Sequence, residues 1–215
     1  MPEKLSREYF RKGFKSWKRE FSENKYLILL SLIVIVIAGL VDYYSGLYVS
    51  SAKVTAVPDL ILDHVRPVNL SFVFVYLYIF TILILFLYPL IFHIRKLNVV
   101  LNQFGLLVIL RSVFIIFTHL KTPLDAVPIS FPWIFKGLSF QNDLFFSGHT
   151  AVPFLGFLLF RESKIRYMFL AISVILGISV LLMHRHYSID VFSAFFITYC
   201  SYKIANFLLR KIKSS

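Results

Sequence analysis

Two short polar motifs stand out in an apolar sequence because their side chains could carry out chemistry. Residues 145–150, FFSGHT, place Ser147, Gly148 and His149 where the chain becomes apolar again after a proline-containing loop. Further along, HRHYSID contains His186 and Asp190. Unpaired polar groups are costly in hydrocarbon, so such clusters at the ends of apolar segments are candidates for function.

The residue types and their spacing indicate phosphoryl transfer. His186 and Asp190 are four residues apart, so they share a face if a helix begins near them. A carboxylate bound to one ring nitrogen fixes the tautomer and leaves the other nitrogen as a nucleophile or base. His149 stands at the expected start of another helix, where free N–H groups favour an anion, and Ser147 and Gly148 allow close backbone approach there. One histidine would attack phosphorus while the other protonates the leaving oxygen.

Arg111, in VILRSVFII, is the other unusual residue. An arginine near the end of an apolar segment either extends to the interface or binds an anion, and its planar fork suits phosphate oxygens. HRH could instead supply two metal ligands, but no further cysteine or carboxylate cluster completes a metal site, so we expect no metal or other cofactor. We expect structural roles for the remaining histidines, His64, His93, His119 and His184.

Membrane-spanning helices are the elements that must position these residues. The chain has 215 residues, of which 58% are hydrophobic and 18% aromatic, and its mean hydropathy is +0.76. A soluble domain of this size could not bury so much apolar surface in one core. We therefore predict an all-α membrane protein. Its apolar runs predict six transmembrane helices, near 26–48, 70–92, 99–118, 144–160, 167–183 and 189–209.

The distribution of basic residues predicts how these helices are oriented. The formal net charge is +12, and Lys and Arg concentrate in residues 1–25, in the turns after the second and fourth spans and at the C-terminus. The positive-inside rule then places both termini in the cytosol and both histidine motifs on the non-cytosolic face. Basic residues beside membrane segments favour anionic lipid headgroups, so we expect no nucleic-acid partner.

We predict two parts of the chain, a basic amphipathic cytosolic segment over 1–25 and a catalytic membrane domain over 26–215. Aromatic residues recur at helical spacing in and near the first part, namely Phe10, Phe14, Trp17 and Phe21. This pattern is typical of a helix lying in the membrane interface, although a partner-binding helix is an alternative. The loop over 119–143, with Trp133 and Phe135, is either an apolar lid or an interfacial anchor.

The histidine motifs resemble those of the lipid phosphate phosphatase (PAP2) superfamily and, within it, of the sphingomyelin synthase-related branch. Asp143 precedes the serine as in that branch's motif CGDxLFSGHT. LRS at 110–112 is similar to its third-helix motif, and VPDLILDH at 57–64 resembles its first outer loop. Phe146 replaces the proline of the phosphatase motif PSGH, and Val180 replaces the arginine of SRxxxxxHxxxD, as in the branch.

One pair of residues departs from the branch pattern, because Gln141 and Asn142 stand where the branch has Cys-Gly. The resemblance otherwise implies a PAP2-like helical core without a metal. It implies that His186 is the nucleophile, that Asp190 orients it, and that His149 protonates the departing lipid alcohol and later deprotonates the acceptor. The candidates for binding the substrate phosphate are Arg111, Ser147, Gly148 and Asp143.

The function that these expectations favour is transfer of a phospho-headgroup from a glycerophospholipid to ceramide or diacylglycerol. Membrane lipids are therefore the expected partners, whereas the headgroup, the acceptor and the oligomeric state stay open. A first alternative uses the same site with water as the acceptor, as a lipid phosphatase or a phospholipase C-like hydrolase. A second alternative is a lipid transporter or scaffold without turnover, but nothing in lipid transport requires the histidine–carboxylate pair.

Overall fold

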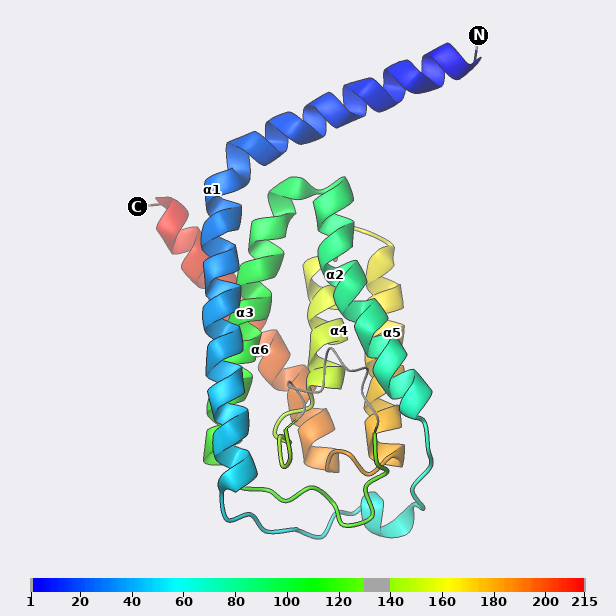
Figure 1. Ribbon diagram of the computed structural model, residues 1–215, viewed down its shortest axis with the longest axis vertical. Helices are drawn as coiled ribbons and strands as arrows, with labels where there is room; N and C mark the ends of the chain where they lie inside the picture. The colour runs from blue at the N-terminus through cyan, green and yellow to red at the C-terminus, as the bar shows by residue number, and fades with distance from the viewer. Residues whose placement is uncertain (1, 130–139, 215) are drawn as a thin grey trace.

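The computed structural model describes residues 2–129 and 140–214, and the side chains of residues 14–129 and 140–208. Over this part of the chain there are six α-helices and no β-strand, which confirms the predicted all-α class (Figure 1). The helices are α1 (Pro2–Ser51), α2 (Tyr78–Phe92), α3 (Ile94–Phe117), α4 (Gly148–Leu159), α5 (Ile165–Leu182) and α6 (Ser188–Ser214). Two short helical turns, η1 (Leu62–His64) and η2 (Val73–Leu77), lie between α1 and α2.

Five of the described helical segments are long and apolar enough to cross a membrane, and α4 is the exception. The span expected over 144–160 was too long, because α4 has only 12 residues. At 1.5 Å per residue it extends about 18 Å, against a hydrocarbon core of about 30 Å. Ser147, just before it, has an extended backbone with ψ of 111°. The structure thus supports a multi-span membrane protein, and the sixth crossing stays a prediction.

The first helix joins the expected amphipathic segment and the first span without a break. Figure 1 shows α1 bending, so that its N-terminal part points away from the bundle. Trp17 donates a hydrogen bond from Nε1 to the Leu90 carbonyl at 2.7 Å and stacks with Phe14 and Phe21. The side chain of Phe10 lies outside the described residues, and contact of this segment with the membrane interface stays a prediction.

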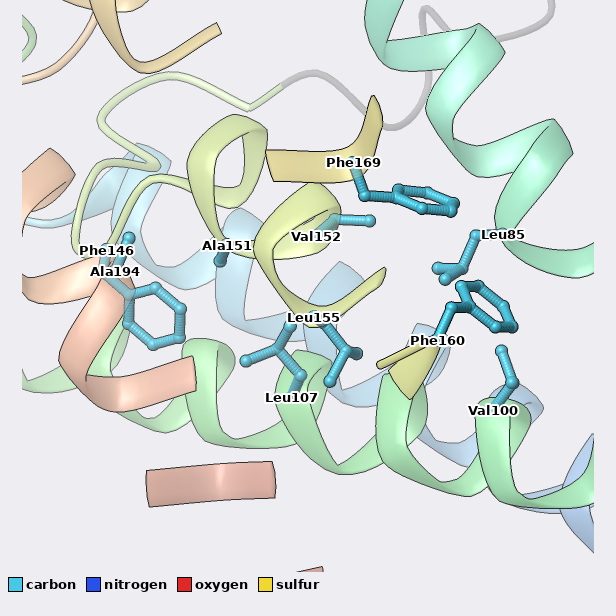
Figure 2. Close-up of a cluster of buried hydrophobic side chains, with 10 residues drawn as sticks. All are labelled: Leu85, Val100, Leu107, Phe146, Ala151, Val152, Leu155, Phe160, Phe169 and Ala194. Atoms are coloured by element: carbon cyan, nitrogen blue, oxygen red, sulfur yellow. The ribbon is translucent and has the colours of Figure 1, made fainter. Parts of the chain in front are cut away.

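The short helix α4 lies at the centre of the bundle, in contact with α2, α3, α5 and α6. Side chains of α4 and of these helices form one buried cluster with the residues that flank α4, as Figure 2 shows for Leu85, Val100, Leu107, Phe146, Ala151, Val152, Leu155, Phe160, Phe169 and Ala194. In a bilayer, helices are held together largely by close packing around small residues. Gly156 is one such residue, since a Cβ there would overlap the ring of Phe169. This close approach packs α4 directly against α5.

The connections that follow α1 and α3 lie side by side at one end of the bundle. Thr55 donates its N–H to the His119 carbonyl at 3.2 Å and accepts the Lys121 N–H at 3.0 Å. Figure 1 shows these connections at the lower end, where α6 begins, and both chain termini at the opposite end. The two histidine motifs are therefore separated from the termini by the length of the bundle.

Candidate active site

The two histidine motifs meet where α4 and α6 begin. The Ser147 N–H donates to the Asp190 carbonyl at 3.1 Å, which ties the two helix starts together. In Figure 1 the lower end of α4, where Gly148 stands, lies higher than the lower ends of α3 and α5. The start of α4, which carries His149, is therefore recessed within the bundle, whereas α6 begins at its lower end.

His186 and Asp190 form the pair that their spacing predicts. Nδ1 of His186 lies 3.3 Å from Oδ2 of Asp190, and both side chains are buried. The same carboxylate oxygen accepts the N–H of Tyr187 at 3.0 Å, so the carboxylate is held in place. An interaction at Nδ1 leaves Nε2 of His186 as the nitrogen for chemistry.

His149 is held between two aromatic rings. Its ring stacks on Phe74 with the centroids 3.8 Å apart, and its centroid lies 4.1 Å from that of Tyr78. Nε2 of His149 is buried and has no hydrogen-bond partner among the described residues. Buried polar atoms are normally paired, so this nitrogen is suited to exchange a proton with a bound substrate.

Arg111 is surrounded by acidic and carbonyl groups. Its Nη2 lies 2.8 Å from Oδ1 of Asp143, its Nη1 donates to the other carboxylate oxygen at 3.2 Å, and its Nε donates to the Phe146 carbonyl at 2.9 Å. Asp42 of α1 lies 3.7 Å from Nη1 and accepts a hydrogen bond from Ser112. Two carboxyl groups thus face one guanidinium, which leaves Arg111 less free for phosphate than the sequence predicted.

Arg185 offers a second cation. It lies between α5 and α6 and lines the same cavity as the two site histidines. No acidic side chain pairs with it over residues 14–129 and 140–208. Burial lowers the pKa of Arg185, but a guanidinium stays protonated at neutral pH. Arg185 therefore brings an uncompensated positive charge to the site.

A cavity of about 480 Å³ connects these groups. At its polar end lie His149, His186, Arg111, Arg185 and Asp143. Its other walls are mainly apolar. They come largely from three helices, with Ile35, Ala38 and Gly39 on α1, Ile79, Ile82 and Leu83 on α2, and Phe104, Leu107 and Val108 on α3. From Arg111 to Phe104 along α3 is about 10 Å. Gly39 of α1 and Leu83 of α2 line the cavity and are also exposed, so its apolar part reaches the outer surface of these two helices.

The remaining histidines have structural surroundings. His184 is buried, and its Nδ1 lies 2.8 Å from Oδ2 of Asp125 in the loop after α3. His64 contacts the Leu60 carbonyl, and His93 separates α2 from α3. The described residues hold no group of three His, Cys, Asp or Glu side chains that could bind a metal ion.

Sequence reasoning overlooked two residues of this site. Asp42 carried a visible signal, since an acidic residue inside the predicted span 26–48 marks a functional candidate. Arg185 carried no separate signal, because a basic residue in a connection between two spans is ordinary and the motif was interpreted through its histidines. The expected lid residues Trp133 and Phe135 lie outside the described residues.

Comparison with known proteins supports a family assignment. Residues 142–207 match the family model described as PAP2 superfamily C-terminal, and this segment contains α4, α5 and both histidine motifs. The match supports membership of the PAP2, or lipid phosphate phosphatase, superfamily, whose members are phosphatases and phosphotransferases that act on phosphate esters. No curated protein and no solved structure matches the chain. The sphingomyelin synthase-related branch stays a prediction.

Proposed function

We propose that the chain is a membrane enzyme that transfers a phospho-headgroup from a glycerophospholipid to a second lipid alcohol, ceramide or diacylglycerol. One observation carries the proposal: the two histidine motifs line a cavity that is otherwise mainly apolar and that reaches exposed residues of α1 and α2. A water-soluble phosphate ester would not need the apolar part. A lipid would place its phosphate at the histidines and an acyl chain between α1, α2 and α3.

The first half of the reaction breaks the bond between phosphorus and the glycerol oxygen. Nε2 of His186 attacks phosphorus and forms a phosphorus–nitrogen bond, while Asp190 stabilises the positive charge that develops on the ring. His149 gives its proton to the departing oxygen, so that diacylglycerol leaves as a neutral alcohol. In the second half, His149 removes the proton of the acceptor hydroxyl, whose oxygen attacks phosphorus as the bond to His186 breaks.

The phosphate would be held by Arg185 and by the start of α4. The side chain of Ser147 makes no capping hydrogen bond to the first turn of α4. The N–H groups of that turn therefore remain suited to phosphate oxygens, as at other helix N-termini. Arg185 would supply the positive charge for the phosphate, because the charge of Arg111 is balanced by Asp143 and Asp42.

The distribution of charge supports an orientation for this reaction. Lys and Arg gather at the end of the bundle that carries both termini, and the histidine motifs lie at the other end. We propose that both termini are cytosolic and that transfer occurs on the non-cytosolic leaflet.

The same chemistry with water as the acceptor would make the protein a lipid phosphatase. The burial of His186, the recessed start of α4 and the two aromatic rings packed against His149 favour a lipid alcohol, because they limit the access of water. A scaffold without turnover gives no account of a buried carboxylate placed against His186.

The products of the reaction test this proposal. Purified protein in vesicles is incubated with a phospholipid labelled in its headgroup, with and without ceramide or a diacylglycerol whose acyl chains differ from those of the donor, and the lipids are resolved. We expect the label in a new lipid whose formation needs the added acceptor and is lost in the His186→Ala variant. Label released mainly into water, even with acceptor present, would favour the phosphatase, and a complete lack of product would favour the scaffold.

A further inference from the structure

The start of α6 lacks the usual local cap. The first N–H groups of a helix have no partner within it, and a Ser, Thr, Asp or Asn just before the helix normally accepts one of them. Here Tyr187 occupies that place and has no short side-chain oxygen. Asp190 accepts the N–H of Tyr187 itself, which leaves the N–H of Ser188 to be satisfied from elsewhere.

Asp59, in the loop that follows α1, supplies the missing cap. Its Oδ2 accepts the Ser188 N–H at 2.7 Å and the Ser188 hydroxyl at 2.8 Å, across 129 residues of sequence. Its Oδ1 accepts the N–H groups of Ile61 at 2.9 Å and Leu62 at 3.1 Å. The carboxylate is buried, and these hydrogen bonds hold it to its own loop through Oδ1 and to α6 through Oδ2.

The charge of Asp59 suits this place. Burial alone would raise the pKa of the Asp59 carboxyl, but the hydrogen bonds donated by Ser188, Leu62 and Ile61 outweigh it, so the pKa lies below its ordinary value. The group is thus ionised at neutral pH, and its negative charge faces the positive end of the α6 dipole. Because the pKa is lowered on folding, this stabilisation is lost only when the pH falls through the lowered value.

A second attachment holds the same stretch of chain. The Tyr187 hydroxyl donates to the Lys121 carbonyl at 2.8 Å and accepts the N–H of Val57 at 3.3 Å. Val57 lies in the connection that follows α1 and Lys121 in the connection that follows α3, and these two connections pair through Thr55. The residues directly after His186 are therefore fastened to both connections.

We propose that Asp59 is a positioning residue. From the connection that follows α1 it caps α6, and it thereby holds the His186 ring against Asp190 and the cavity. His186 precedes the capped residue by two positions, so a shift of this backbone would move the ring away from Asp190 and from the cavity. The effect on turnover rests on the proposed function, whereas the cap itself does not.

The Asp59→Ala variant tests the proposal by two independent readouts. We expect amide hydrogen exchange over residues 186–190 to become roughly tenfold faster, because a charged cap is lost. We also expect kcat to fall roughly tenfold while KM stays within about twofold, since the nucleophile and not the lipid site is displaced. Asp63→Ala is the control from the same loop, because the Asp63 side chain accepts the Asp59 N–H and has no hydrogen bond to α6 among the described residues. It should change both readouts much less than Asp59→Ala does.

The possible outcomes separate the cap itself from its effect on turnover. Unchanged exchange over 186–190 would overturn the cap, whatever the activity. Faster exchange with unchanged kcat would show that Asp59 only stabilises the fold. If the unmodified protein turned over no lipid, the proposed function would fail. The cap would then be tested by amide hydrogen exchange over residues 186–190 alone. Should Asp59→Ala not fold, Asp59→Asn serves instead, because its amide keeps one of the two acceptor oxygens and should give intermediate values.

Discussion

Replacing His186 with alanine will lower turnover by about a hundredfold or more, because the variant lacks the nitrogen that attacks phosphorus. His186 is buried against Asp190 and lines the cavity, so no other described side chain can take its place there without rearrangement. His149→Ala should have an effect of similar size, because both the departing and the attacking oxygens need its proton transfer. Initial rates with a saturating labelled phospholipid measure both variants.

An exposed histidine outside the site provides the control for these variants. His64→Ala should retain full turnover, since this side chain contacts only a backbone carbonyl of its own loop. Thermal unfolding in detergent should show that all three variants fold. Near-normal turnover by folded His186→Ala would remove the phosphohistidine from the mechanism.

Neutralising the two arginines of the cavity will have different effects: loss of Arg185 will mainly lower activity, and loss of Arg111 will mainly lower stability. Arg185→Gln should lower kcat/KM by about 10- to 100-fold, because a charge-assisted hydrogen bond to phosphate contributes about 1.5–3 kcal/mol. Its stability should change little, since no described acidic side chain depends on it. Arg111→Gln should mainly destabilise the fold, by about 1–3 kcal/mol, because it leaves the half-buried carboxyl groups of Asp143 and Asp42 without a cation.

A second substitution separates these two roles. Asp143→Asn in the Arg111→Gln background should recover part of the lost stability, because one of the two uncompensated carboxyl groups is removed. The same change should not rescue Arg185→Gln. A stable Arg111→Gln protein with strongly reduced kcat/KM, beside an unaffected Arg185→Gln protein, would return phosphate binding to Arg111.

The sequence predicted the helical class and the residues of the histidine motifs because both depend on local patterns. Apolar runs identify helices, and four-residue spacing places His186 beside Asp190. It overestimated the length of α4, because the run 144–146 is as apolar as a helix, although residues 145 and 146 form a bend and Ser147 is extended.

Contacts between distant segments could not be predicted in this way. Arg111 was expected to bind phosphate, but its partners Asp42 and Asp143 come from α1 and from the approach to α4. The bond from Ser188 to Asp59 joins residues 129 positions apart, and neither residue carries a signal that names the other. Such pairings depend on the three-dimensional arrangement of the loops.

Capture of the reaction intermediate tests the central claim most directly. Protein in vesicles is exposed briefly to a phospholipid labelled in its phosphate and is quenched in alkali, because a phosphorus–nitrogen bond is acid-labile. The account predicts label on the peptide that contains His186, its loss when ceramide or diacylglycerol is added, and its absence from His186→Ala. Transfer of label between lipids without any labelled His186, or with the label on another residue, would contradict it.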